Sequence, residues 1–219
     1  MTTESEAGQP SAYYATRYVP DPNRARTWQH ITHFLGRWIA SDADVLELGA
    51  GYCDFSNALQ ARSRTAMDLD EAVRHSAAAG VRAEVGDCTD LSRFATSSFD
   101  VVFASNLLEH LDRPAGEQMV REAGRVLRKG GHLVLMQPNF RLRPREYFDD
   151  YTHVSVYSDR SLPDFLESLG LETVDVMPRF LPQSMKSRFS GLTAVVPWYL
   201  RSPVKPLAGQ MLVVARRPR

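Results

Sequence analysis

The fold is decided at Val45-Leu46-Glu47-Leu48-Gly49-Ala50-Gly51-Tyr52-Cys53-Asp54, where an apolar run breaks into two glycines one residue apart and helix-forming residues follow. This order predicts a strand, a tight turn and the start of a helix. Glycine at positions 49 and 51 lets the backbone take positive φ and lets a ligand approach where a Cβ would block it. The stretch therefore predicts a nucleotide-type cofactor site at the turn.

The position of Asp54 bears on which cofactor suits this turn. A dinucleotide fingerprint has a third glycine, or another small residue, three positions after the second one, and Asp54 occupies that position. A carboxylate suits a helix N-terminus but would repel a pyrophosphate bound to the same amides. S-adenosylmethionine has an adenosine and a cationic sulfonium but no phosphate, so we expect it here. An NAD-dependent oxidoreductase is disfavoured but stays an alternative.

The composition limits the class of protein. The chain has 219 residues, which suits one domain over residues 21–219 with a flexible arm over 1–20. Its 26 basic and 26 acidic side chains balance, which disfavours nucleic acid as a partner. Cys53 and Cys88 make neither a disulfide framework nor a metal spacing, so we expect a cytoplasmic protein without a metal. No apolar run approaches the roughly 20 residues that cross a bilayer, so we expect no membrane insertion.

Apolar strand patterns alternate with helical patterns along the chain. Strands are expected at 45–48, 65–68, 81–85, 99–104, 132–137, 171–177 and 211–215. Helices are expected from Asp21-Pro22 to about 39, and at 55–61, 71–79, 117–127 and 161–170. This alternation predicts an α/β fold with a doubly wound, Rossmann-like and mostly parallel sheet, whose ligand crevice lies at the carboxyl ends of the strands.

Three expected strands end in polar residues that would meet at this crevice. Asp68 lies roughly twenty residues after the glycines, where a carboxylate typically binds ribose hydroxyls. Its alternative role is a helix cap shared with Asp70. Asp87 follows the third strand, where a carboxylate can accept from an adenine amino group, and Asn106 follows the fourth strand. The agreement of separate strand tips favours a cofactor site more than any single motif does.

Three blocks, VLELGAG (45–51), FDVVFASNLLEHL (99–111) and RVLRKGGHLVLMQPN (125–139), resemble the class I S-adenosylmethionine-dependent methyltransferases of the small-molecule type. The resemblance covers about residues 44–139 and implies a seven-stranded sheet with a reversed final hairpin. It implies cofactor contacts from Glu47, Gly49, Ala50, Gly51, Asp68, Leu69, Asp87, Cys88 and Asn106. The family often has glycine where this chain has Cys53, and a side chain there would narrow the pocket. A looser resemblance, at 147–153 and 179–182, suggests a bacterial glycan or natural-product subgroup by analogy.

The segment Tyr13-Tyr14-Ala15-Thr16-Arg17-Tyr18 places three tyrosines and an arginine in six positions. One interpretation is an aromatic clamp that packs the N-terminal arm on the domain. The other is a lid, in which Tyr14 and Arg17 contact the cofactor and Tyr13 and Tyr18 face the substrate.

Candidate catalytic residues follow the fourth strand. Methyl transfer is an in-line displacement at an activated carbon, so the enzyme mainly aligns the nucleophile and excludes water. We expect His110 to act as general base and Glu109 to orient it or to close the cofactor pocket. Alternatively, His110 caps or packs the next helix. His153 is the second candidate base, and Tyr151 is grouped with it as catalytic.

Two segments are expected to cover the substrate. In 138–160, Tyr147, Tyr151 and Asp150 would contact a ring or a cationic group, unless the segment is only a folded cover. The segment 178–209 contains basic residues and no acid, so it is either a solvated loop or a cover for an anionic group.

These observations predict a cytoplasmic S-adenosylmethionine-dependent methyltransferase. Its substrate would be a small molecule, anionic or aromatic, methylated on oxygen, nitrogen or an aromatic carbon. A non-catalytic subunit that binds S-adenosylmethionine is the alternative, and a homodimer is compatible with either.

Overall fold

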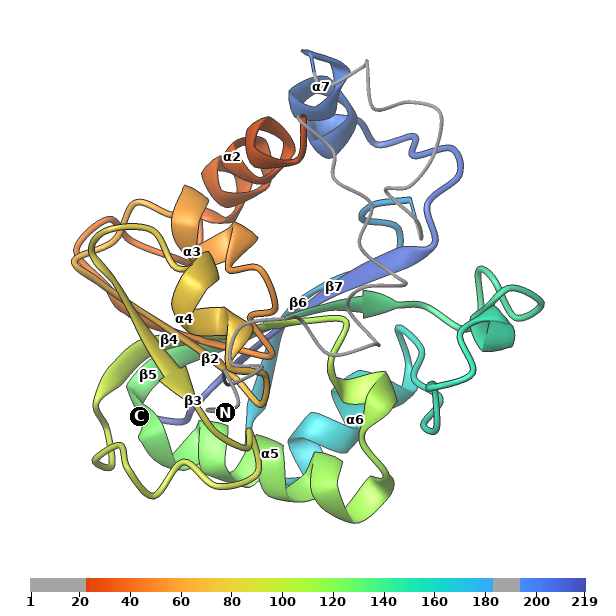
Figure 1. Ribbon diagram of the computed structural model, residues 1–219. Helices are drawn as coiled ribbons and strands as arrows, with labels where there is room; N and C mark the ends of the chain where they lie inside the picture. The colour runs from red at the N-terminus through yellow and green to blue at the C-terminus, as the bar shows by residue number, and fades with distance from the viewer. Residues whose placement is uncertain (1–22, 183–193) are drawn as a thin grey trace, which may run out of the picture.

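Seven strands form one sheet in the spatial order β3-β2-β1-β4-β5-β7-β6 (Figure 1). The structure is a computed structural model that describes residues 23–182 and 194–219. The strands are Asp44–Leu48 (β1), Ser63–Asp68 (β2), Val81–Val85 (β3), Phe99–Ser105 (β4), Leu127–Pro138 (β5), Glu172–Met177 (β6) and Gln210–Arg216 (β7). The first five are parallel, and β7 is antiparallel to both β5 and β6. The predicted mostly parallel sheet with a reversed final hairpin is confirmed.

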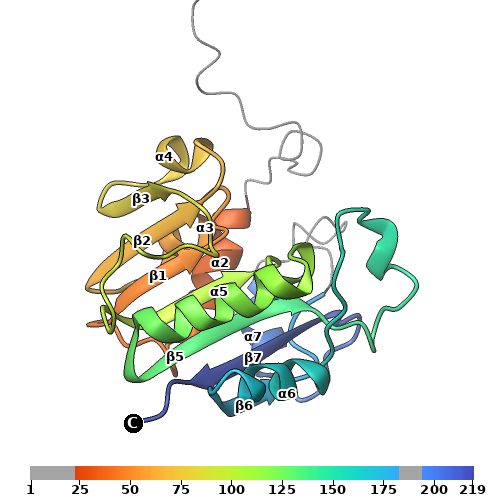
Figure 2. The same cartoon turned by 90° about the horizontal axis from the view of Figure 1, so that it is seen from below.

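Helices cover both faces of this sheet. They are Arg24–Leu35 (α2), Asp54–Ala58 (α3), Ala72–Ser76 (α4), Arg113–Val126 (α5), Ser161–Ser168 (α6) and Val196–Arg201 (α7), with short 3₁₀ helices at Leu108–His110 (η1) and Tyr147–Asp149 (η2). Helices α2, α3 and α7 lie on one side of the sheet, and α5 and α6 lie on the other (Figures 1 and 2). None of the described helices is long and apolar enough to cross a membrane.

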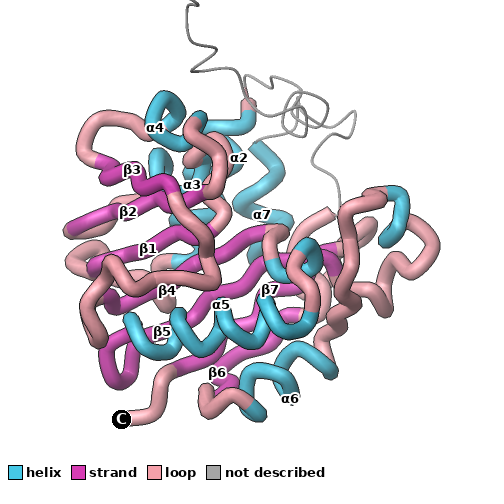
Figure 3. Tube along the Cα trace, turned by 60° about the horizontal axis from the view of Figure 1, so that its bottom comes forward, coloured by secondary structure: helices cyan, strands magenta, loops and turns pink. Residues whose placement is uncertain are grey.

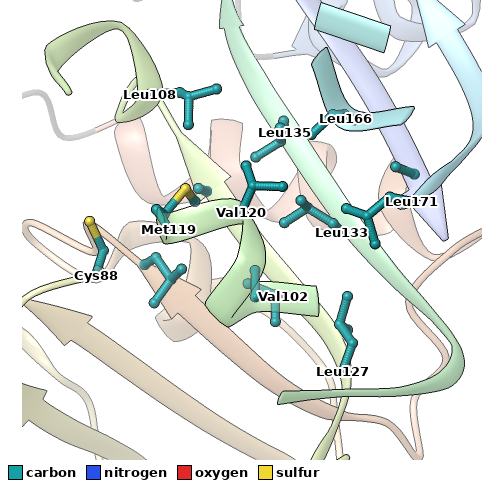
Figure 4. Close-up of a cluster of buried hydrophobic side chains, with 14 of the residues drawn as sticks. Cys88, Val102, Leu108, Met119, Val120, Leu127, Leu133, Leu135, Leu166 and Leu171 are labelled. Carbon is teal, nitrogen blue, oxygen red and sulfur yellow. The ribbon is translucent and has the colours of Figure 1, made fainter. Parts of the chain in front are cut away.

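The two larger apolar cores of the described residues lie on opposite faces of the sheet. On the α5 and α6 face, Val102 and Leu133 of the sheet pack with Met119, Val120 and other buried side chains (Figure 4). On the opposite face, Trp28 of α2 packs edge to face on both Phe55 and Phe103, which stack on each other with their ring centroids 3.8 Å apart. Burying each large apolar side chain contributes about 1.5–3 kcal/mol. The sheet, which positions the site, is therefore held on both faces.

Helix α5 begins one turn earlier than the pattern at 117–127 predicts. Asp112 caps it, because its Oδ1 accepts a hydrogen bond from the Ala115 amide at 2.9 Å, and Pro114 occupies the first turn. The apolar stripe starts only at Met119, so periodicity alone placed the start of the helix too late. The expected helix at 71–79 is also shorter, since Ala77 has an extended backbone after α4 ends.

Part of the basic segment 178–209 is a helix rather than a solvated loop. Helix α7 packs against α2, and Leu200 is buried in the same core as Trp28. The proline in its first turn fits the start of a helix, where the missing amide proton costs no intrahelical hydrogen bond. Residues 183–193 of the segment lie outside the described part of the chain.

The register of the parallel strands places their carboxyl ends side by side. Leu48 at the end of β1 pairs with Met67 of β2 and with Ala104 of β4. Gly49, Asp68 and Ser105 therefore emerge at one edge of the sheet. This edge is the predicted crevice.

Candidate functional site

A cavity of about 1480 Å³ opens at the carboxyl ends of the parallel strands. We call the part lined by the turn after β1 and the tips of β2 and β3 the turn side. The part lined by η1 and by residues 138–160, the cover segment, is the cover side. The cover segment projects beyond the end of β5, with η2 near its tip (Figure 3). The predicted cofactor residues that line the cavity are Glu47, Gly49, Ala50, Gly51, Asp68, Leu69, Asp87, Cys88 and Asn106.

Both glycines of the turn adopt the conformation that their sequence predicts. Gly49 has φ +66° and Gly51 has φ +51°. A Cβ on Gly49 would lie 2.9 Å from Cδ1 of Leu107, so a side chain there would be both strained and crowded. The turn thus presents bare backbone to the cavity.

Asp68 fixes this turn from the neighbouring strand. Its Oδ2 accepts a hydrogen bond from the Gly51 amide at 2.8 Å, and its Oδ1 accepts one from the Asp70 amide at 2.9 Å. The Asp70 side chain in turn caps α4 through the Ala72 amide at 2.8 Å. The alternative capping role is therefore also present in the structure. Asp68 also lines the cavity, so its carboxylate oxygens, which together offer about four acceptor sites, can accept from ligand hydroxyls there.

Glu47 is a buried acid at the end of β1. Its Oε2 accepts from the Ser56 hydroxyl at 2.5 Å and from the Ser56 amide at 3.1 Å. Burial raises the pKa of Glu47 to about 8; the Ser56 hydrogen bonds oppose the shift, and the negative charges of Asp54 and Asp68 add to it. A cationic group bound beside Glu47 would favour its ionised form.

Asp54 does not face the cavity as an isolated anion. It forms a hydrogen-bonded ion pair with Arg24, the first residue of α2, and both residues line the cavity. The argument that Asp54 repels a pyrophosphate is therefore weaker than the sequence suggested, because a guanidinium lies beside the carboxylate. The local pattern gave no signal for Arg24, which comes from a different helix.

Cys53 does not narrow the pocket, contrary to the expectation from its departure from the family pattern. It adopts a left-handed backbone conformation with φ +57°, and its buried thiol donates to the Val73 carbonyl at 3.6 Å. The side chain therefore packs between the turn and α4, and Cys53 is not among the residues that line the cavity.

The tips of β3 and β4 complete the turn side. Asp87 is exposed, and its Oδ1 accepts from both the amide and the hydroxyl of Thr89. Cys88 is 7% exposed, and burial raises the pKa of its thiol to about 12, so the thiol is neutral. Asn106 has φ +50°, and its Oδ1 accepts from Nε2 of Gln210 at 3.0 Å. Asn106 is thus held in place by the final strand.

On the cover side, Glu109, His110 and His153 lie together. One potential ligand atom from each lies within 4.8 Å of the other two, and the two imidazole centroids are 4.9 Å apart. Glu109 is fully buried, and burial raises its pKa to about 8. Neither of its carboxylate oxygens has a hydrogen-bond partner among the described residues. The predicted orienting contact from Glu109 to His110 is therefore not a hydrogen bond in this structure.

Thr152 determines the tautomer of His110. The Thr152 carbonyl lies 3.3 Å from Nδ1 of His110 and can only accept, and the Thr152 hydroxyl lies 2.9 Å from the same nitrogen. That hydroxyl donates its proton to Oδ1 of Asp150 at 2.5 Å. Nδ1 must then be the protonated nitrogen, and Nε2 of neutral His110 carries the lone pair. Thr152 had not been predicted as a site residue.

Other predicted residues of the cover segment have different places. Asp150 and His153 line the cavity. Tyr147 does not: its ring is fully buried within the segment, and its hydroxyl donates to the Ser155 carbonyl at 2.7 Å. Tyr151 is 82% exposed and is not among the cavity-lining residues. The structure therefore brings neither tyrosine to the cavity, because one packs inward and the other points to solvent.

The predicted lid residues Tyr13, Tyr14, Arg17 and Tyr18 lie outside the described part of the chain. Two further cavity-lining residues, Arg24 and Trp28, come from α2, which the sequence indicated only as a core helix. These two side chains reach the cavity only because α2 packs over the turn.

The comparisons with known proteins agree with this geometry. A family model described as a methyltransferase domain matches residues 21–176. No curated protein matches the chain significantly.

Solved structures share the fold at low sequence identity. A chain from the complex of the Haloferax volcanii Trm112 methyltransferase activator with a methyltransferase has a TM-score of 0.63 and 16% identity, covering 92% of this chain and 100% of that one. An Archaeoglobus fulgidus SAM-dependent methyltransferase has a TM-score of 0.62 and 17% identity, covering 86% and 94%. The [4+2]-cyclase SpnF has a TM-score of 0.59 and 20% identity, covering 87% and 81%. At such identities the likeness shows the fold alone.

Proposed function

The chain belongs to the methyltransferase domain family, whose members use S-adenosylmethionine, and on that premise we propose that it methylates a hydroxyl or amine of a polar small molecule. The observation that supports this acceptor class is His110. Its Nε2 carries the lone pair, because Nδ1 donates to Thr152, and His110 lines the same cavity as the glycine turn.

The turn side suits the cofactor. The glycine turn, in which Gly49 and Gly51 both have positive φ, adjoins the buried carboxylate of Asp68, whose oxygens can accept from ribose hydroxyls. Asp87 and Cys88 would hold the adenine, and Asn106 would lie near the amino acid part. S-adenosylmethionine supplies a methyl group on a cationic sulfur. The acidic side chain of Glu47 provides charge that complements the cationic groups of this cofactor.

The cover side would hold the acceptor. We propose that Nε2 of His110 accepts the proton that the hydroxyl or ammonium loses, which typically contributes about 10²–10⁴-fold to a rate. His153 lies beside it as the second candidate base. The cover segment, through Thr152 and Asp150, keeps the His110 ring oriented.

The charges of the cover side favour a neutral or cationic acceptor. Its wall contains Glu146, Asp149 and Asp150, and Arg143, the one arginine among the described residues of this side, pairs with Glu146 at 3.3 Å. Hydroxyl-rich molecules, such as sugar or natural-product precursors, suit such a wall because they exchange hydrogen bonds with carboxylates.

The predicted anionic or aromatic substrate gains less support. From the basic segment 178–209, only Pro182 and Leu207 are among the described cavity-lining residues. Its Lys186 and Arg188 lie outside the described residues. The two tyrosines predicted to stack on a ring are turned away from the cavity.

The test is a screen of cell extract with methyl-labelled S-adenosylmethionine, followed by identification of the labelled product by mass. We expect one small polar product. His110→Ala should lower turnover by about 10²–10⁴-fold without loss of cofactor affinity, whereas His33→Ala, at an exposed position of α2, should leave both unchanged.

Two results would contradict the proposal. Full turnover by His110→Ala at all pH values would remove His110 as the base. Cofactor binding with no labelled small molecule would instead support the alternative of a non-catalytic subunit.

A further inference from the structure

Glu109, His110 and His153 place one carboxylate and two imidazoles around a common point on the cover side of the cavity. One ligand atom from each lies within 4.8 Å of the other two. Glu109 and His110 come from η1, and His153 comes from the cover segment, so the fold and not the local sequence assembles the group. Two imidazoles and one carboxylate are a donor set that binds divalent zinc or iron in proteins.

The Glu109 carboxyl group is buried at the centre of this cluster. Its side chain is 0% exposed, and neither oxygen has a hydrogen-bond partner among the described residues. A buried polar group without a partner costs free energy, and buried carboxylates are usually paired or bound to a metal. A cation between Glu109 and the two imidazoles would offset this cost.

His110 is already oriented as a metal ligand is. Its Nδ1 donates to the carbonyl and hydroxyl oxygens of Thr152, and that hydroxyl donates to Asp150. Metal-binding histidines almost always donate their second ring N–H to a carbonyl or carboxylate in this way, which fixes the orientation of the ring. Oδ2 of Asp150 also lies 3.9 Å from Nε2 of His153.

Backbone hydrogen bonds hold the cover segment against η1. The Glu109 carbonyl accepts from the amides of Val154 and Ser155 at 2.9 and 3.1 Å. The Ser155 hydroxyl donates to the Leu111 carbonyl at 2.6 Å, and the Ser155 carbonyl accepts from the Tyr147 hydroxyl. His153 is therefore held next to Glu109 by the residues that immediately follow it, so the three side chains are placed before any ion binds.

We propose that Glu109, His110 and His153 bind one divalent transition-metal ion of the zinc class. Nitrogen and oxygen ligands lie about 2.0–2.2 Å from such an ion, so two ligand atoms on one ion are at most about 4.4 Å apart. In the structure the ligand atoms lie within 4.8 Å of one another, and small side-chain rotations would bring them to this distance. The expectation of no metal rested on cysteine spacing, and this set contains no cysteine.

The role of the ion deepens the proposed function and rests on it. Three protein ligands leave an open position, as in catalytic zinc sites, and an acceptor hydroxyl bound there loses its proton more readily. The acceptor oxygen forms the new bond to carbon while the bond from that carbon to sulfur breaks. The electron pair of the broken bond stays on sulfur, and the hydroxyl proton leaves to water. With the ion bound, His110 is a ligand; without it, His110 is the base.

The direct test is calorimetric titration of the tag-free, metal-stripped full chain with Zn²⁺ alone. We expect one ion per chain, and a higher unfolding temperature in its presence by mass action. Glu109→Gln and His153→Ala should each weaken binding by at least about tenfold. The controls His33→Ala and Cys88→Ser should bind as the wild type does, because neither residue belongs to the cluster.

The outcomes separate the two proposals. No Zn²⁺ binding by the wild type, or equal binding by Glu109→Gln and His153→Ala when both are folded by circular dichroism, would overturn the metal site. Binding of Mg²⁺ in place of Zn²⁺ would overturn the assigned ion class. Methylation at an undiminished rate in a chelator, without bound ion, would overturn the role of the ion in the reaction and leave the proposed function, with His110 as the base, standing. Stoichiometric Zn²⁺ binding without any methylation would leave only the metal site standing.

Discussion

Replacing Asp68 with alanine perturbs the centre of the proposed cofactor site, because one carboxylate both holds the turn and lines the cavity. It accepts hydrogen bonds from the amides of Gly51 and Asp70 at 2.8 and 2.9 Å and is 6% exposed. A hydrogen bond to a charged group contributes about 1.5–3 kcal/mol. Water that enters the cavity replaces part of this contribution, so we expect Asp68→Ala to lower the free energy of unfolding by about 2–3 kcal/mol.

The effect of Asp68→Ala on cofactor affinity should be at least as large. If Asp68 accepts from two ribose hydroxyls as we propose, the variant removes two charge-assisted hydrogen bonds, which contribute about 3–6 kcal/mol together. Since about 1.4 kcal/mol is a factor of ten, the Kd for S-adenosylmethionine should rise on the order of 10²–10⁴-fold. Asp68→Asn keeps the shape and one acceptor oxygen, so its effect should be intermediate.

Isothermal titration calorimetry measures this affinity, and circular dichroism shows that each variant is folded. Asp175→Ala is the matched control, because Asp175 is an aspartate of β6 at the other edge of the sheet. A folded Asp68→Ala protein whose Kd stays within about threefold of the wild type would refute the assignment of Asp68 to the ribose.

Three further predictions follow from single contacts. The pKa of Glu47 is about 8 in the folded protein against 4.5 when exposed, so between these pH values the folded state binds a proton that the unfolded state has lost, and the free energy of unfolding should fall as pH rises from 4.5 to 8. Denaturant titrations across this pH range should show a smaller fall in the free energy of unfolding for Glu47→Gln than for the wild type. An equal dependence on pH in the two proteins would contradict the raised pKa. Gly49→Ala should cost about 1–3 kcal/mol in thermal unfolding, because φ is +66° and the Cβ meets Leu107 at 2.9 Å; an unchanged melting temperature would be inconsistent with this strain. Tyr147→Phe should cost about 1 kcal/mol through its lost bond to Ser155 and leave cofactor affinity unchanged, whereas weaker cofactor binding would point to a site role.

The turn side of the site was predictable because it depends on local pattern. A strand, two glycines and a helix start specify the turn at 49–51, and parallel strands necessarily end at one edge. Asp68, Asp87 and Asn106 therefore met where the sequence placed them. The same local reasoning failed at helix ends, where the cap at Asp112 lay outside the apolar stripe.

Contacts between distant segments were decided by the tertiary structure. Arg24 pairs with Asp54 because α2 packs over the turn, and no periodicity in either helix encodes that pairing. The direction of the Cys53 thiol follows from a left-handed backbone conformation, which residue type alone does not indicate.

The cover segment shows the same division. Its sequence indicated polar and aromatic residues near the substrate, but Tyr147 is buried and Tyr151 points to solvent, because packing within the segment selects which side chains face inward. By itself, the sequence determined the parallel sheet, the glycine turn and the acids at its edge, since these depend on the order of apolar and turn residues. Only the tertiary structure placed His153 beside Glu109 and His110, because backbone hydrogen bonds from Val154 and Ser155 to the Glu109 carbonyl join segments far apart in the chain.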